Sequence, residues 1–236
     1  MNRTLVAVAG FVAALQVASA GDVTGKVTLK GTPPAEKDIT ADVKTDANCG
    51  KLHTDPVKTR FFVVGNGGAL ADVVVMLKGV PNAKSGGAAA APLVLDQKGC
   101  EYIPYVGAAQ TGQKIVVKNS DPTTHNVHPS PVAGGNKEDN KAQFAGAADL
   151  TFEFPTAENF LKFKCDVHPW MFSYITVVDH PYFAVTGKDG TFTIKDVPAG
   201  KYTIVALHRK AAPTGSEQPI EVKADGGKAD FTLEVK

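Results

Sequence analysis

The chain has 236 residues, of which 43% are apolar and 21% charged, so it has enough apolar side chains to bury a core. This composition excludes a disordered or collagen-like chain, and the length fits one large or two small domains. The formal net charge is only +1 and basic residues form no block beside aromatic ones, so we expect no nucleic-acid partner.

Residues 1–20 have the pattern of a secretory signal peptide. A short positive start precedes an almost wholly apolar run at 5–17, and Ala-Ser-Ala then forms a small-residue cleavage site. A membrane anchor is the alternative, but it needs roughly 20 apolar residues, whereas Gly10 and Gln16 interrupt this shorter run. No Cys follows the cleavage site to carry a lipid. We therefore expect a periplasmic or otherwise exported protein whose mature chain has no membrane span.

Strand-like segments follow one another along the rest of the chain. Runs rich in β-branched and aromatic residues occur at 23–29, 61–64, 73–77, 114–118, 174–178, 192–194, 202–206 and 231–235. Clusters of Gly, Pro, Asn and Asp separate them. No amphipathic pattern of useful helical length occurs. The sequence therefore predicts an all-β fold built from sandwiches or barrels.

Two boundaries divide the mature chain. Residues 82–91 are low in complexity and end in four consecutive Ala, which is typical of a linker or exposed loop. A second boundary lies at residues 179–181, where a β-rich run ends at a proline. The stretch between them, 92–179, has the length of a compact β domain.

The two flanking pieces, 21–91 and 180–236, resemble the two halves of a carboxypeptidase regulatory-like domain, which is a small transthyretin-like β-sandwich. The similar segments are 21–27 and 71–79 in the first half, and 186–194 and 197–205 in the second. This resemblance implies one sandwich with the middle domain inserted into a loop, and exposed loops tolerate insertion. Three small units in a row are the alternative.

Four residues of the middle segment carry candidate metal chemistry. Cys165, His168 and Met171 lie three positions apart, so one short loop presents a thiolate, an imidazole and a thioether. Apolar residues alternate with Lys before this loop, which places Cys165 on the core side of a strand. His125 follows the turn at 119–122 and supplies a second imidazole that would face the interior.

Two imidazoles and one thiolate with a long axial thioether are the ligand set of a blue copper electron-transfer site. Thiolate and thioether suit Cu(I) and imidazole suits Cu(II), so this set can hold both oxidation states. Zinc is the rival metal, but a thioether is a poor zinc ligand and no second Cys/His pair accompanies the loop. The sequence predicts one copper ion bound by His125, Cys165, His168 and Met171.

The segments 118–128 and 163–171 resemble the cupredoxins, and the short Cys-x-x-His-Pro-aromatic-Met loop is most similar to that of the amicyanins. The resemblance implies a Greek-key β-sandwich over about residues 92–179, with copper near one end. It also implies that Asn126, next to the first ligand, ties the two ligand loops together by hydrogen bonds.

The same resemblance implies an electron port. The outer edge of His168 would reach the surface within an apolar collar of Pro169, Trp170 and Phe172. The family's amine-oxidising partner is not carried over, because the flanking sandwich is a departure from the family's stand-alone form.

The remaining histidines are interpreted as structural or surface residues: His53, His128, His180 and His208. His128 lies three positions from His125 and so faces the opposite side of a strand, but it is worth testing as an accessory contact. Cys49 and Cys100 remain once Cys165 is reserved for metal, and an oxidising compartment favours a disulfide between them. Two separate thiols are the alternative.

The function expected from these features is an exported one-electron carrier between redox protein partners. Copper enzymes hold a further catalytic copper, usually through extra pairs such as His-x-His, which the chain lacks. Four protein ligands also leave no open position for a substrate, so we expect no enzyme. The alternative is a cell-envelope binding or scaffold β-sandwich protein in which copper is stored or structural.

Overall fold

The computed structural model describes residues 20–210 and 215–234. The expected signal peptide lies outside the described residues except for Ala20, which is the first residue of β1. The described part of the chain is almost entirely β, so the predicted all-β class is confirmed. None of its helices has the length and apolar character required to cross a membrane.

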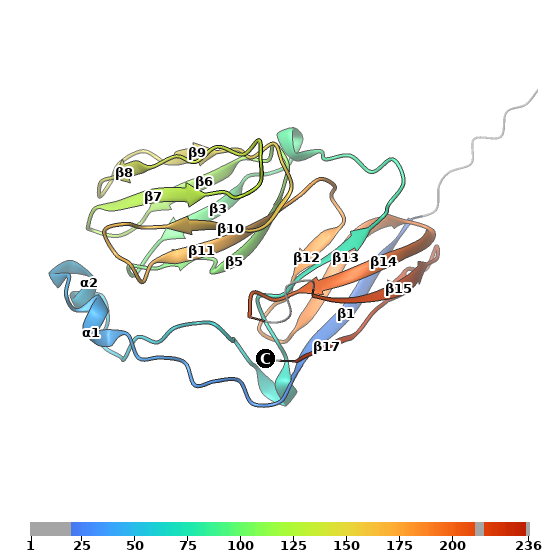
Figure 1. Cartoon of the computed structure of the whole chain (residues 1–236), viewed down its shortest axis with the longest axis horizontal. Coiled ribbons are helices and arrows are strands. Elements are labelled where there is room, and N and C mark those ends of the chain that lie inside the picture. Colours follow the sequence, from blue (N-terminus) through green and yellow to red (C-terminus); the bar gives the residue numbers. More distant parts are fainter. Residues whose placement is uncertain (1–19, 211–214, 235–236) are drawn as a thin grey trace, which may run out of the picture.

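The strands form four sheets arranged as two sandwiches (Figure 1). The outer sandwich contains β1 (Ala20–Lys30), β13 (Thr191–Pro198), β16 (Gly227–Lys228) and β17 (Phe231–Glu234) in one sheet, and β2 (Val74–Lys78), β12 (Phe183–Val185), β14 (Gly200–Leu207) and β15 (Ser216–Val222) in the other. The central sandwich contains β5 (Val106–Gln110), β7 (His125–Ser130), β8 (Lys141–Gln143), β10 (Glu158–Lys164) and β11 (Phe172–Val178) in one sheet, and β3 (Leu93–Gln97), β4 (Tyr102–Ile103), β6 (Ile115–Asn119) and β9 (Leu150–Phe152) in the other.

The outer sandwich joins segments that are far apart in the sequence. β1 pairs antiparallel with β13 and parallel with β17, and β2 pairs antiparallel with β14. Apolar residues that alternate along these strands meet between the two sheets, as the period-2 pattern predicts. The chain before the central sandwich and the chain after it therefore share both sheets.

The central sandwich has a separate core. β3 pairs parallel with β6, and β11 pairs parallel with β5 and antiparallel with β10. The alternation before Cys165 has the predicted effect, since Leu161 and Phe163 are fully buried while Lys162 lies at partial exposure. A third, smaller apolar cluster, which includes Tyr105 and Val205, joins the central sandwich to the outer one.

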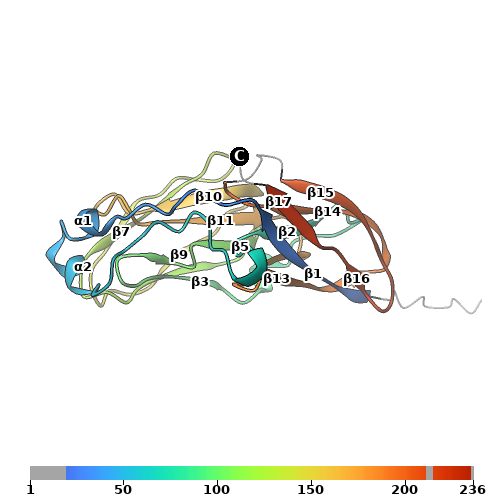
Figure 2. The same ribbon diagram turned by 90° about the horizontal axis from the view of Figure 1, so that it is seen from below.

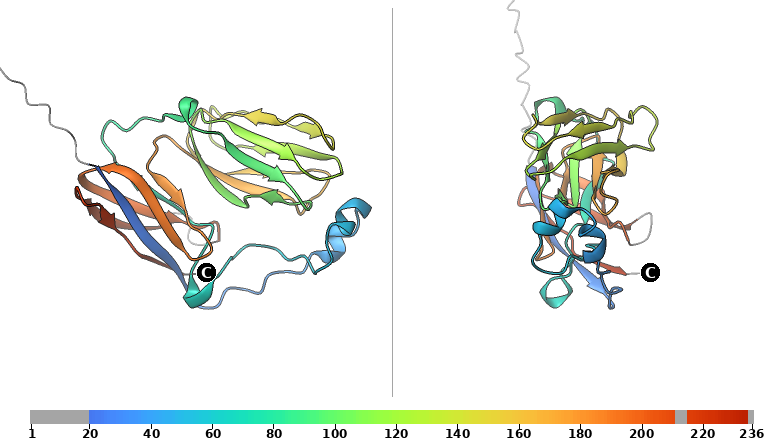
Figure 3. Two further views of the ribbon diagram at one scale, coloured as in Figure 1. Left: turned by 180° about the vertical axis from the view of Figure 1, so that it is seen from behind. Right: turned by 90° about the vertical axis from the view of Figure 1, so that its left-hand side faces the viewer.

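Residues 31–65 form an excursion that we call the arm. It leaves β1, carries two short helices, α1 (Thr40–Val43) and α2 (Ala47–Lys51), and returns to the 3-10 turn η1 (Asn66–Gly68). Its helices lie against the end of the central sandwich that is distant from the outer one, and both passes of the arm run alongside the central sandwich (Figures 2 and 3). Val43 and Cys49 of the arm are buried in the core of the central sandwich.

The predicted strand at 61–64 is wrong. This segment belongs to the arm and makes only an isolated bridge, from Val64 to Leu70. β-branched composition favours a strand only where a neighbouring strand is available. Here Phe61 instead packs into the cluster between the sandwiches, and Phe62 stacks on the ring of His208.

The low-complexity segment 82–91 forms a loop that contains the 3-10 turn η2 (Gly87–Ala89). It is not exposed throughout, because Gly87 is buried and a Cβ on it would lie 2.2 Å from the carbonyl oxygen of Thr111. Ser85 Oγ also donates a hydrogen bond to the same carbonyl. The loop is therefore fastened to the central sandwich.

Candidate metal centre

Two neighbouring strands position the predicted ligands. His125 is the first residue of β7, which pairs antiparallel with β10. β10 ends at Lys164, and the loop to β11 contains Cys165, His168 and Met171. Two backbone hydrogen bonds close this loop, from Cys165 N to Met171 O (3.1 Å) and from Met171 N to His168 O (2.9 Å). The loop is therefore a compact turn at the edge of the core.

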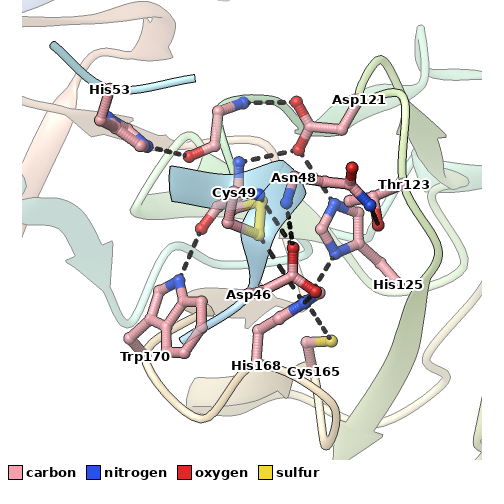
Figure 4. The surroundings of a disulfide bond; sticks show 12 residues. Asp46, Asn48, Cys49, His53, Asp121, Thr123, His125, Cys165, His168 and Trp170 are labelled. Atoms are coloured by element: carbon pink, nitrogen blue, oxygen red, sulfur yellow. Dashed lines mark hydrogen bonds and ion pairs between the residues drawn. A yellow bond between two sulfur atoms is a disulfide. The ribbon is translucent and has the colours of Figure 1, made fainter. Parts of the chain in front are cut away.

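The structure brings the predicted imidazoles and the thiol together (Figure 4). His125 Nδ1 lies 2.9 Å from His168 Nδ1, and Cys165 Sγ lies 3.6 Å from the same His168 nitrogen. All three side chains are buried, with at most 2% of each residue exposed. Met171 is 1% exposed and belongs to the same core cluster as Cys165. Soft sulfur and imidazole nitrogen in one buried cluster fit copper by their donor chemistry.

Asp121 orients His125, and the sequence analysis did not identify it. Its Oδ2 atom accepts a hydrogen bond from His125 Nε2 at 2.9 Å, which leaves Nδ1 as the nitrogen facing Cys165 and His168. The carboxylate also accepts backbone hydrogen bonds from Gly99 N (2.6 Å) and Cys100 N (2.7 Å). A carboxylate four residues before a candidate ligand, within a turn, is the signal that could have identified it.

The protonation of this cluster follows from its hydrogen bonds. Burial alone would lower the pKa of His125, but hydrogen bonds and charge from Asp121 and Cys165 raise it to about 9. Burial would raise the pKa of Cys165, but hydrogen bonds with His125 and His168 lower it to about 6. For Asp121, hydrogen bonds likewise outweigh burial, and the pKa lies below its ordinary value. The pocket therefore favours the thiolate form of Cys165, which is the metal-binding form.

Asn126 links the two ligand segments. Its backbone N–H donates to Cys165 Sγ at 3.4 Å. Its side-chain oxygen accepts hydrogen bonds from the backbone N–H groups of Asp166 (2.6 Å) and Val167 (3.3 Å). The strand that carries His125 is thus tied to the loop that carries Cys165 and His168.

The expectation that the edge of His168 reaches the surface is wrong, because the arm covers it. His168 is 1% exposed. Its Nε2 atom lies 3.4 Å from Asp46 Oδ2 and 3.7 Å from Cys49 Sγ, both at the N-terminal end of α2. Asp46 is held there because it caps α2, accepting hydrogen bonds from Asn48 N and Cys49 N.

The predicted disulfide between Cys49 and Cys100 is confirmed, with a Cα–Cα distance of 5.6 Å. It fastens α2 to the central sandwich beside the ligand cluster (Figure 4). In the predicted collar, Pro169 is exposed and Trp170 is partly buried. The Trp170 ring lies 5.2 Å from the His168 ring, and its Nε1 donates to Cys100 O at 3.1 Å.

The other histidines lie outside this cluster. His128 contacts Asp166 and, through Nε2, Glu138 at 2.6 Å. His53 and His180 hydrogen-bond to backbone carbonyls, and His208 is buried against Phe62. Two further groups with metal-ligating atoms occur among the described residues, but each includes Cys49 or Cys100, whose sulfurs are bonded to each other.

No protein-family model and no curated protein matches this chain. Among solved structures, it is similar to a reduced amicyanin variant (20% identity, 44% of this chain and 97% of that one, TM-score 0.32). It is also similar to a purple cupredoxin from Nitrosopumilus maritimus (18% identity, 36% and 98%, TM-score 0.30).

A third similar structure is a copper-containing nitrite reductase from Thermus scotoductus, with 18% identity and a TM-score of 0.33. That alignment covers 37% of this chain and 22% of the reductase, so this chain spans under a quarter of the enzyme's length. Each likeness covers less than half of this chain. The copper proposal below therefore rests on the side chains of the candidate centre.

Proposed function

We propose that this protein binds one copper ion through His125, Cys165, His168 and Met171, and carries single electrons between redox partners. The observation that carries this proposal is that two imidazole nitrogens and one thiol sulfur lie close together in a buried cluster. A bound copper ion would supply the exchange of one electron between Cu(II) and Cu(I).

The chain's own residues would keep the centre in one geometry. Asp121 holds the ring of His125 through its Nε2–H, and Asn126 holds the loop that contains Cys165. Because both hydrogen-bonding partners are buried and their backbones are paired in strands or turns, the ligand positions are preorganised. With four side chains as ligands, no position is left for a substrate, so we propose electron carriage rather than bond chemistry.

The two cysteine roles support export as part of this proposal. A disulfide persists in an oxidising compartment, and Cys49–Cys100 is present together with a buried, unbonded Cys165. We propose that the outer sandwich is a carboxypeptidase regulatory-like module that carries the central sandwich, at about residues 92–179, as an insertion. The pairing of β1 with β13 and of β2 with β14 supports this arrangement.

The burial of His168 favours a second candidate, a scaffold protein that stores copper or uses it structurally. A metal whose outer ligand is covered by α2 is harder for a protein partner to approach directly. The two candidates differ in the kinetics of reduction. An electron carrier loaded with Cu(II) is reduced and reoxidised rapidly and reversibly by outer-sphere reagents, whereas a storage or structural site exchanges electrons slowly or irreversibly.

The test is the visible spectrum of the copper-loaded protein. A thiolate–Cu(II) centre gives an intense blue colour, and we expect Cys165→Ser and His125→Gln to abolish it. His128→Gln is the matched control, since it changes a histidine on the same strand that faces away from the cluster, and it should leave the colour unchanged. A blue Cys165→Ser variant, or a wild-type protein that takes up only zinc and stays colourless, would contradict the proposal.

A further inference from the structure

The outer nitrogen of His168 needs a hydrogen-bond partner of its own. Nδ1 of His168 lies 2.9 Å from Nδ1 of His125 and 3.6 Å from Cys165 Sγ, so this nitrogen faces the other candidate ligands. A neutral imidazole that binds a metal through one nitrogen has its proton on the other. Because His168 is only 1% exposed, a proton on Nε2 requires an acceptor within the protein.

Asp46 of the arm is in position to supply that acceptor. Its Oδ2 atom lies 3.4 Å from His168 Nε2. Cys49 Sγ lies farther away, at 3.7 Å, and sulfur is a weaker acceptor than a carboxylate oxygen. Asp46 Oδ1 accepts hydrogen bonds from Asn48 N (2.8 Å) and Cys49 N (2.9 Å). One carboxylate oxygen therefore caps α2 while the other faces the imidazole (Figure 4).

The second imidazole of the cluster has the same arrangement. Nε2 of His125 donates to Asp121 Oδ2 at 2.9 Å. Both imidazoles thus direct Nδ1 towards the cluster and Nε2 towards a carboxylate. Histidines that bind metals usually donate their other N–H to such a group, which fixes the ring and raises its basicity.

The disulfide connects the supports of the two carboxylates. Cys49 donates its backbone N–H to Asp46, and Cys100 donates its own backbone N–H to Asp121 at 2.7 Å. The bond between Cys49 and Cys100 therefore links the helix that carries Asp46 to the segment that holds Asp121. One crosslink fixes the positions of both carboxylates.

We propose that Asp46 is a positioning residue of the copper centre, which orients His168 through Nε2 and is held in place by the disulfide. This inference rests on the proposed function and adds the arm to the centre. A negative charge beside a ligand favours Cu(II) over Cu(I), because the ion of higher charge gains more from it. Asp46 therefore lowers the reduction potential of the centre, and displacement of the arm from His168 raises it.

The main test removes the charge of Asp46 and keeps its capping role. Asn is as good an N-cap as Asp, so Asp46→Asn retains α2 and removes the carboxylate. Loss of such a supporting group typically weakens metal binding 10–100-fold. If Cu(II) binding weakens tenfold and Cu(I) binding does not change, the potential rises by about 59 mV. Competition with a Cu(II) chelator and voltammetry of the copper-loaded protein measure the two effects.

Asp42→Asn is the matched control for this substitution. Asp42 is an exposed carboxylate on α1 of the same arm, so the variant makes the same change in net charge at a residue outside α2. Its Cu(II) affinity and its potential should equal those of the wild type. Equal shifts in the Asp42→Asn and Asp46→Asn variants, or no shift in either, would overturn the proposal.

The role of the disulfide is tested with the Cys49→Ala and Cys100→Ala double variant. It keeps the carboxylate of Asp46 but unties α2, so its reduction potential should also rise. Adding Asp46→Asn to the double variant should then raise the potential by less than it does in the wild type, because both changes act on one contact. Fully additive shifts would show that the disulfide does not hold Asp46 at His168.

A measurement on metal-free protein separates this inference from the proposed function. Nitrogen-15 spectra of the histidine rings at pH 7 report which nitrogen of His168 has a proton, and we expect one on Nε2. An unprotonated Nε2 would overturn the contact with Asp46, since a carboxylate can only accept. If no blue centre forms, the copper proposal fails, while these spectra still test Asp46. If the centre is blue and Asp46→Asn behaves like the wild type, the role of Asp46 fails and the copper proposal stands.

Discussion

The two sandwiches have similar secondary structure but very different interiors. Within the described residues, eleven polar or charged side chains are buried, and nine of them belong to the central sandwich. The outer sandwich contains only Thr186 and His208. Burying polar groups is costly unless they are hydrogen-bonded, so an almost wholly apolar core is the simpler way to stabilise a sandwich.

The polar interior of the central sandwich is concentrated towards its ligand end. Gln143 on β8 lies opposite His125 on β7. The side chain of Gln143 donates a hydrogen bond to Val117 O at 3.0 Å and accepts one from Gln97 Nε2 at 2.6 Å. Asp121 and Asn126 extend the same network to the candidate ligands. The difference indicates that the outer sandwich is built for stability, whereas the central one holds side chains in fixed positions for a site.

The largest expected effect comes from the link that the arm makes to the central sandwich. Removing the disulfide with Cys49→Ala and Cys100→Ala should lower the free energy of unfolding by about 4 kcal/mol, the loop-entropy value for a crosslink of this span. Urea unfolding monitored by far-UV circular dichroism measures this loss. A dithiol reductant should destabilise the wild-type protein similarly and leave the double variant unaffected.

The same substitution should loosen the cover over His168, because Cys49 and the neighbouring Asp46 would no longer be fixed there. Limited proteolysis should then cut the arm between residues 44 and 60 faster than the outer sandwich. If the arm resisted proteolysis equally in both proteins, contacts such as the burial of Val43 would be sufficient to hold it.

The second largest expected effect is a loss of stability at low pH, caused by the one buried histidine of the outer sandwich. His208 is 4% exposed, and burial lowers its pKa to about 4. The folded-state pKa of His208 lies below the unfolded value of about 6.5. The contribution of the neutral imidazole to the free energy of unfolding is therefore fully present above pH 6.5, and it is lost as the pH falls through 4. The loss should be about 3 kcal/mol.

The His208→Gln variant lacks the titrating imidazole. The free energy of unfolding of this variant should therefore fall less between pH 7 and pH 4 than that of the wild-type protein. Chemical denaturation of metal-free protein at both pH values measures the difference. An unchanged pH dependence in His208→Gln would show that the titration of His208 does not contribute to acid sensitivity.

The third effect concerns the central sandwich alone. Asp121→Asn removes the carboxylate that holds His125 Nε2, and loss of such a supporting group typically weakens metal binding 10–100-fold. Competition with a copper chelator measures the affinity. Asp139→Asn, which breaks only a surface ion pair with Lys141, should leave it unchanged. Equal affinities in the Asp121→Asn variant and the wild type would remove Asp121 from the centre.

Local pattern predicted much of the fold because period-2 alternation directly reports burial on one face of a sheet. It identified β1, β2, β6, β13 and β14, and it correctly placed Leu161 and Phe163 inside. It failed on the arm, where residues 61–64 have strand-like composition but no neighbouring strand.

The burial of His168 under the arm could not be predicted from the local sequence pattern, for a different reason. Cys49 and His168 are 119 positions apart, and their contact depends on how the arm folds back over the central sandwich. Asp121 was closer to prediction, since it lies only four residues before His125. Its role became clear only when the carboxylate, the imidazole and the backbone of Gly99 and Cys100 were seen together.

The smallest expected effect is seen when the two methionines that follow residue 20 are compared by substitution. Met171 is buried in the core cluster that contains Cys165, and Met76 lies on β2 of the outer sandwich. Replacing either by Leu nearly conserves volume, so each should cost less than about 1.5 kcal/mol of stability. Only Met171→Leu should shift the reduction potential of the copper-loaded protein, because an axial thioether tunes the potential more than it secures the metal. Voltammetry of both variants checks this, and equal potentials would remove Met171 from the ligand set.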